Sequence, residues 1–169
     1  TELQGHIVGD TIMAAGSVAY FGPLTGDYRA QLRTQWENSI KKVNIKMSEH
    51  NDLTATCGQP VEIQQWQLCG LPTDSLSTEN AIIMAKNRSW PLLIDPQGQA
   101  NSFIQKRHEN DNLQVCKLSD SGYSKVIESA IRFGNPCLLE NVGETLDPLL
   151  DPILQKQTFL IGSKPHMKI

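Results

Sequence analysis

Hydrophobic residues recur at helical spacing through the first part of the chain. The stretch from Glu2 to Phe21 is predicted to be a helix rich in small residues, which would let another helix approach closely, and Gly22-Pro23 breaks it. A second helix follows, for which Asp27 can serve as the cap. Its apolar positions fall on one helical face: Tyr28, Leu32, Trp36, Ile40 and Val43.

Boundary residues for three shorter helices are recognisable in the next part of the chain. Gly58 would end a short helix within a polar stretch. Pro60 suits the first turn of the following helix, and Gly70 suits the residue just past its end. Ser77 is typical of an N-cap for a helix that runs to Asn87. The buried side of the middle helix would come from Val61, Ile63 and Trp66.

From Trp90 onward short apolar runs alternate with helical segments. Pro91–Ile94, residues 113–118 and Cys137–Leu139 have the apolar character of buried strands. Helices are expected over residues 101–109 and from a cap at Ser121 to Gly134. This alternation is typical of a parallel sheet with right-handed crossovers. We therefore predict an α/β fold, with N-terminal helices over residues 1–89 and an α/β core over residues 90–169.

Composition narrows the class of protein. The chain has 169 residues, a formal net charge of −3 and 39% hydrophobic residues, which fits a water-soluble globular domain rather than a disordered chain. The weak negative charge argues against a nucleic-acid partner. The longest apolar stretch, Thr11–Leu24, is shorter than the roughly 20 residues of a membrane span, and no signal peptide is recognisable. We expect neither a nucleic-acid nor a membrane partner.

The four cysteines do not form a metal-binding pattern. They contain no C-x-x-C pair, and the histidines do not stand at zinc-ligand spacing from them; the cysteines are Cys57, Cys69, Cys116 and Cys137. We expect reduced, mostly buried thiols in an intracellular protein and no metal site, although the sequence leaves a disulfide open.

The turn after the first apolar run is the candidate for chemistry. Ligands of open α/β sheets bind beyond the carboxyl ends of the strands, where a phosphate-binding loop would have the pattern G-x-x-x-x-G-K-[ST]. Here Asp95 and Ala100 replace its two glycines, Asn101 replaces the lysine, and Ser102 keeps the hydroxyl position. The whole degenerate loop comprises Asp95, Pro96, Gln97, Gly98, Gln99, Ala100, Asn101 and Ser102.

Each of these departures weakens phosphate binding. Asp95 brings a carboxylate toward an anionic ligand, a repulsion of about 4 kcal/mol at ~4 Å and an effective dielectric of 20. Ala100 adds a Cβ where backbone N–H groups would cradle the phosphate. Asn101 removes the cation that meets the β- and γ-phosphates. The loop is therefore predicted not to bind nucleotide.

The third apolar run gives a second part of the same candidate site. A Walker B strand ends in an acidic residue that holds Mg²⁺, and a glutamate that activates water often follows it. The corresponding residues here are Cys137, Leu138, Leu139, Glu140 and Asn141. Glu140 could serve a metal, but the amide of Asn141 is no base at neutral pH. An ordinary parallel α/β domain with an unspecialised turn remains the alternative, and we predict no catalytic residue.

Several strings, in order and spacing, resemble the dynein heavy chain family. They are the run from Trp90 to Asn101, the run from Cys137 to Pro148 with residues 152–157 behind it, residues 70–74 with 77–80, and Ala19-Tyr20 through Tyr28-Arg29. Together they resemble the fifth AAA+ module of that motor, in wording closer to axonemal than to cytoplasmic heavy chains. Ala81 and Ser102-Phe103 depart from the family pattern without touching this inference.

The resemblance implies a P-loop NTPase-like AAA+ large subdomain that is an incomplete module, cut before sensor 1 and the lid. Residues 1–89 would lead from the stalk into the module, and residues 158–169 would form a hairpin with Gly162 and Pro165 in or near its turn. The module would carry no cofactor, while ATP and Mg²⁺ would act at other modules of the parent motor ATPase.

The resemblance also implies partners and a location. The partners would be the neighbouring AAA+ modules and the stalk of the same heavy chain, the microtubule through that stalk, and the intermediate and light chains. The location would be the cytoplasm and cytoskeleton, in the axoneme of a cilium or flagellum. Two other functions stay open: an active nucleotide-binding P-loop enzyme, and a helical adaptor that binds a partner through its Tyr28/Trp36 face.

Overall fold

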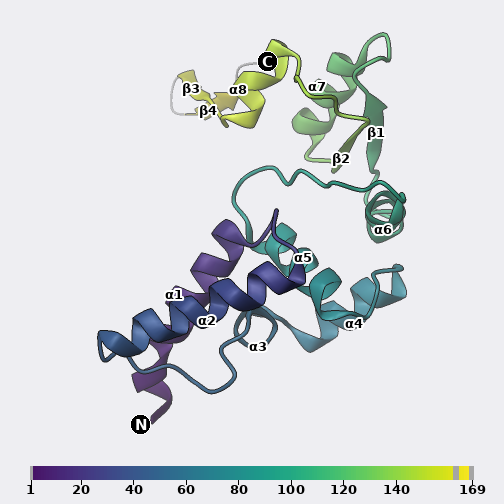
Figure 1. Ribbon diagram of the computed structural model, residues 1–169. Coiled ribbons are helices and arrows are strands. Elements are labelled where there is room, and N and C mark those ends of the chain that lie inside the picture. Colours follow the sequence, from purple (N-terminus) through teal and green to yellow (C-terminus); the bar gives the residue numbers. More distant parts are fainter. Residues whose placement is uncertain (1, 162–163, 168–169) are drawn as a thin grey trace. The chain divides into compact units, whose positions relative to one another are not determined.

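The computed structural model describes residues 2–161 and 164–167 (Figure 1). The chain divides into two compact units, Thr1–Ile94 and Asp95–Ile169, which we call the helical unit and the α/β unit. None of the helices in the described ranges is long and apolar enough to cross a membrane.

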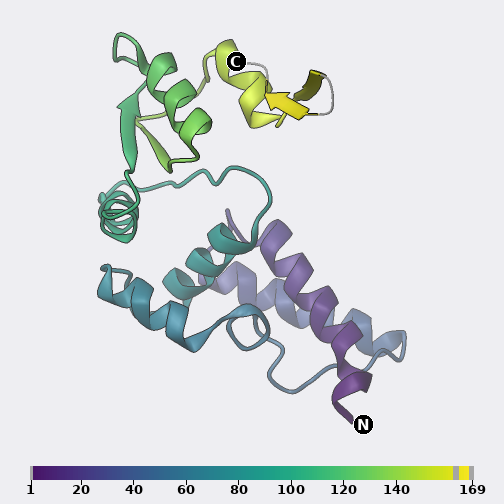
Figure 2. The same cartoon turned by 180° about the vertical axis from the view of Figure 1, so that it is seen from behind.

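The described residues of the helical unit form five helices. They are α1 (Glu2–Tyr20), α2 (Gly26–Lys42), α3 (Leu53–Cys57), α4 (Pro60–Leu68) and α5 (Ser75–Lys86). Helix α1 packs against α2, α3 and α5, and both views show α1 and α2 side by side (Figures 1 and 2). The most deeply buried side chains of the helical unit are those of Met13, Phe21, Leu53 and Ile82.

Small residues of α1 permit this packing, as the sequence predicts. A Cβ on Gly16 would lie 2.8 Å from the ring of Trp36. A Cβ on Gly9 would lie 2.4 Å from the carbonyl oxygen of Lys46. Both contacts are closer than a side chain tolerates, so the two glycines allow α1 to approach its neighbours.

The existence of the five helices is confirmed, but two predicted caps are wrong. Thr25, not Asp27, is the N-cap of α2, and Asp27 lies in the first turn. Asp74, not Ser77, caps α5, because the Asp74 carboxylate accepts a hydrogen bond from the Ser77 backbone N–H at 2.9 Å. Gly58 ends α3, and Pro60 starts α4, as predicted.

The predicted apolar faces are only partly buried. Ile40 and Trp66 are buried, whereas Tyr28, Val43 and Val61 are exposed. The side of α2 that faces the core instead contains Arg29. Because Arg29 is charged, the spacing of apolar residues does not predict that this position is buried.

The α/β unit contains a small parallel sheet. Strand β1 (Gln114–Lys117) pairs with β2 (Cys137–Glu140), with Gln114 opposite Cys137 and Lys117 opposite Glu140. Helix α7 (Tyr123–Phe133) connects the strands and packs on β1. The remaining elements are α6 (Gln99–Arg107), the 3-10 helix η1 (Pro148–Leu150), α8 (Asp151–Leu154), β3 (Thr158–Ile161) and β4 (Lys164–Met167).

The core of this unit lies between the sheet, α7 and the η1–α8 segment. Its buried members are Cys116, Ile127, Leu150 and Ile153. The predicted cap at Ser121 is wrong, because Gly122 with φ of 92° precedes the helix and supplies no side chain. The predicted end at Gly134, with φ of 71°, is confirmed.

The predicted hairpin near the C-terminus is present as the antiparallel pair β3–β4. Pro165 pairs with Leu160 inside this ladder. Gly162, the other residue expected in or near the turn, lies outside the described residues.

The prediction of a strand over Pro91–Ile94 is wrong. In the described chain this segment has no strand partner, and Leu92 and Ile94 are 74% and 87% exposed. An apolar run becomes a strand only when a neighbouring strand offers backbone donors and acceptors. Within the described residues β1 pairs with β2 and β3 with β4, so no edge is joined to this run.

Candidate functional site

The degenerate loop Asp95–Ser102 forms the start of helix α6. Its backbone turns over residues 96–98, and Gly98 is the N-cap of α6 with φ of 73°. Because glycine offers no capping group, another side chain fills that role: Asp95 Oδ2 accepts a hydrogen bond from the backbone N–H of Asn101 at 2.8 Å. The carboxylate of Asp95 therefore caps α6 from outside the helix.

This cap uses one backbone N–H group at the N-terminus of α6. Phosphates bind at helix N-termini because free backbone N–H groups and the positive end of the helix dipole face them. In this loop one of those N–H groups is already bonded to an internal anion. A second anion at the same place would lose that donor and meet the negative charge of Asp95.

The two halves of the candidate site are brought together by Asn101 and Glu140. Asn101 Nδ2 donates to Glu140 Oε1 at 2.6 Å, which joins α6 to the carboxyl end of β2. Gln105 Nε2 donates to Asn101 Oδ1 at 2.6 Å and lies 3.4 Å from Glu140 Oε1. Lys117 Nζ lies 3.9 Å from Glu140 Oε2. Both carboxylate oxygens of Glu140 thus have partners within the α/β unit.

The other predicted site residues contribute little that could bind a ligand. Ser102 Oγ donates back to the Gly98 carbonyl at 2.9 Å, and Gln99 Nε2 lies 3.4 Å from Gln97 Oε1. Asn141 is exposed with φ of 54°. The remaining members of the two motifs are the exposed Pro96 and Cys137 and the half-buried Ala100, Leu138 and Leu139.

No metal cluster is found in the described part of the chain, where no group of three or more His, Cys, Asp or Glu side chains could hold an ion. Its four cysteines are free. Although Cys137 as a whole residue is exposed, desolvation of its sulfur and the neighbouring thiol of Cys116 raise the pKa of Cys137 to about 11, and burial raises the pKa of Cys116. Both thiols are therefore protonated near neutral pH, which makes them poor nucleophiles.

The face that would serve a helical adaptor is used for packing. Trp36 stacks on Phe21, with ring centroids 5.4 Å apart and planes 11° apart, and meets the edge of Tyr20 at 6.3 Å. Tyr28, the other proposed contact, is exposed and lies outside this stack. Packing within the helical unit therefore accounts for Trp36 without an adaptor partner.

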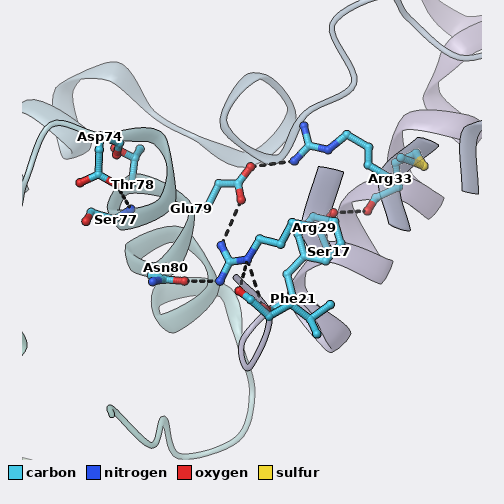
Figure 3. Close-up of polar contacts among 11 residues, drawn as sticks. Ser17, Phe21, Arg29, Arg33, Asp74, Ser77, Thr78, Glu79 and Asn80 are labelled. Atoms are coloured by element: carbon cyan, nitrogen blue, oxygen red, sulfur yellow. Dashed lines mark hydrogen bonds and ion pairs between the residues drawn. The ribbon is translucent and has the colours of Figure 1, made fainter. Parts of the chain in front are cut away.

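Sequence reasoning did not identify a second polar cluster, which lies in the helical unit (Figure 3). Arg29, 3% exposed, bonds to Glu79 and Asn80 of α5, and Arg33 bonds to the second oxygen of Glu79. Both arginines also line an open groove of about 810 Å³. The only sequence signal was that Arg29 and Glu79-Asn80 belong to the strings that carry the family resemblance.

Comparison with known proteins identifies the family. Residues 64–169 match the family described as the ATP-binding dynein motor region. Rat dynein axonemal heavy chain 1 is 49% identical over 158 residues, and mouse dynein axonemal heavy chain 3 is 45% identical over 164. The dynein-1-beta heavy chain of the flagellar inner arm I1 complex from Chlamydomonas reinhardtii is 38% identical over 167.

These matches cover 94%, 97% and 98% of this chain, but the chain spans only 4% of the length of each relative. The family match and the identities agree with the resemblance that the runs from Trp90 to Asn101 and from Cys137 to Pro148 carry. The chain therefore belongs to the ATP-binding dynein motor region family and is similar to part of the axonemal heavy chains.

Proposed function

We propose that this chain is a structural, force-relaying part of the fifth AAA+ module of an axonemal-type dynein heavy chain, and that the module neither binds nor hydrolyses ATP. The observation that carries the proposal is the closed network of Asp95, Asn101 and Glu140. An active site of this class needs free N–H groups, a lysine and a carboxylate open to Mg²⁺. Here one of the N–H groups is bonded to Asp95, an amide, Asn101, replaces the lysine, and the Glu140 carboxylate is hydrogen-bonded to Asn101.

The fold supports the same proposal. A strand, a crossover helix and a parallel strand, β1–α7–β2, is the repeating unit of P-loop NTPase-like sheets. We propose that residues 90–169 belong to an AAA+ large subdomain of this kind. Residues 1–89 would lead from the stalk into it.

The parent heavy chain would supply what this module lacks. ATP and Mg²⁺ would act at other modules, and the stalk would contact the microtubule. Neighbouring modules, the stalk, and intermediate and light chains are the proposed partners. The axonemal names of the relatives support a location in the axoneme of a cilium or flagellum.

Photoaffinity labelling of the parent heavy chain tests the proposed inactivity. The intact motor would be irradiated with a radiolabelled azido-ATP and Mg²⁺, digested, and its labelled peptides sequenced. We expect labelled peptides from other modules, which serve as the internal control, and none from residues 95–141. A labelled peptide in that range, displaced by micromolar ATP, would contradict the proposal.

A further inference from the structure

Arg29 is buried although it carries a full positive charge. Its exposed fraction is 3%, whereas Arg33, one helical turn later on α2, has a side chain that is 23% exposed. A buried charge is tolerated only when its hydrogen-bonding groups are satisfied. The hydrogen-bond partners of Arg29 therefore indicate the role of this buried charge.

The guanidinium of Arg29 joins the turn between α1 and α2 to helix α5 (Figure 3). Nε donates to the carbonyl oxygens of Phe21 and Leu24, at 3.1 and 3.0 Å, in the turn between α1 and α2. Nη1 donates to Glu79 at 3.0 Å, and Nη2 donates to Asn80 at 2.6 Å, both on α5. One planar group thus ties the end of α1 to a helix about 50 residues away in the sequence.

An aromatic side chain also contacts the Arg29 guanidinium. The Arg29 guanidinium carbon lies 5.8 Å from the centroid of the Phe21 ring, and Trp36 stacks on that ring. Cation–π contact and stacking both restrict the motion of the group. The guanidinium therefore has little freedom to change partners.

Arg33 provides the internal comparison. It reaches the other oxygen of Glu79 at 2.7 Å and lies 5.7 Å from the Phe21 ring. No bond from Arg33 to the α1–α2 turn is found among the described contacts. The two arginines share a partner, a ring and a helix, but only Arg29 also bonds to the turn.

We propose that Arg29 is a mechanical clamp that makes α1, the α1–α2 turn and α5 move as one body when the motor works. The inference rests on the proposed force-relaying function. A lysine cannot replace the clamp, because its ammonium lacks the planar fork that reaches carbonyls on one side and α5 on the other. Arg33 strengthens the charge of the cluster but does not connect its two parts.

The test uses the parent heavy-chain motor with R29K and, as the matched control, R33K. Hydrogen exchange would be measured in peptides covering residues 17–25 and 75–86. We expect R29K to speed exchange in both segments together by about 10-fold, and R33K to change neither by more than about 2-fold. No change in R29K, or a change in one segment alone, would overturn the clamp.

Motor assays then separate a clamp from a merely structural residue. For R29K we expect basal ATPase activity within about 2-fold of wild type, with microtubule-stimulated ATPase and gliding velocity lowered several-fold. Loss of basal and stimulated activity together would show that Arg29 only maintains the fold, and unchanged gliding would show that it relays no force. Azido-ATP labelling of residues 95–141 would refute the proposed inactivity and would leave these clamp measurements unaffected.

Discussion

Replacing Asp95 tests whether its carboxylate caps helix α6. In Asp95→Ala the backbone N–H of Asn101 loses its acceptor, because the N-cap residue itself is Gly98. Loss of a capping side chain costs about 1 kcal/mol. Loss of a negative charge at a helix N-terminus costs a further ~0.5 kcal/mol at a half-exposed position. We expect the opening of α6 to become easier by about 1.5 kcal/mol.

Native-state hydrogen exchange of the parent motor measures this free energy directly. About 1.5 kcal/mol corresponds to a roughly 10-fold loss of protection in peptides covering Gln99–Arg107. In Asp95→Asn an amide oxygen still accepts the bond and only the charge is lost, so the expected loss of protection is about 2-fold. The ratio between the two variants separates the hydrogen bond from the charge.

Asp120→Ala is the matched control in the same unit. Asp120 also accepts a backbone hydrogen bond, from Lys117 at 2.9 Å, but it lies in the exposed turn between β1 and α7 and caps no N–H of α6. Its replacement should leave the exchange of α6 unchanged. Equal effects of Asp95→Ala and Asp95→Asn, or protection in Asp95→Ala as high as in wild type, would refute the capping role of Asp95.

Three further predictions concern other parts of the chain. The isolated chain should unfold without the cooperative heat-absorption peak of an ordinary domain, because the parallel sheet formed by the described residues has two strands and Leu92 and Ile94 are exposed; a sharp calorimetric transition would contradict this. Hydrogen bonds from Ser77 lower the pKa of Asp74, so the stabilisation of α5 by this carboxylate is complete above about pH 4 and is lost as the pH falls through the lowered pKa. Hydrogen exchange of α5, corrected for intrinsic rates, should show this loss of protection at low pH, and Asp74→Asn should abolish the pH dependence. The pKa of Cys137 is about 11 rather than 9.0, so its thiolate fraction at pH 7.5 is about 100-fold smaller than that of an unperturbed thiol, while the more basic thiolate is roughly 10-fold more nucleophilic. Alkylation at pH 7.5 should therefore be about 10-fold slower than for an unperturbed thiol, and mass spectrometry showing an equal rate would contradict this.

Elements whose signals are local were predictable from the sequence. Pro60 at the start of α4, Gly58 at the end of α3 and Gly134 at the end of α7 act through their own backbone geometry, so their positions sufficed. Caps were harder to predict, because residues that can cap a helix lie on both sides of the start of α5. Asp74 prevails over Ser77 since its carboxylate reaches the N–H three residues on.

Features that depend on distant partners were not predictable. Pro91–Ile94 has the composition of a strand, but pairing is decided by other segments, and the described chain offers it none. Burial of Arg29 depends on Glu79 and Asn80, about 50 residues later. A single sequence contains no signal that would pair them.

The candidate site combines local features, which the sequence predicts, with features that depend on distant residues, which it does not. The sequence placed Asp95, Asn101 and Glu140 at ends of elements that meet in an α/β fold, and the structure brings Asn101 and Glu140 within hydrogen-bonding distance. The sequence interpreted Asp95 only as a charge that repels phosphate. Its role as a cap depends on the φ of Gly98 and the path of the turn, which no composition rule supplies.

In both units, charged groups that could bind a ligand are bonded to the chain itself. The carboxylates of Asp95 and Glu140 join a turn, a helix and a strand end, and the guanidinium of Arg29 joins a turn and a helix. Each such bond restricts relative motion, because buried or half-buried charges lose several favourable contacts at once when the elements separate. Such bonding is what the proposed force-relaying function requires. The closed Asp95–Asn101–Glu140 network and the Arg29 clamp therefore support the same mechanical role, from two independent parts of the chain.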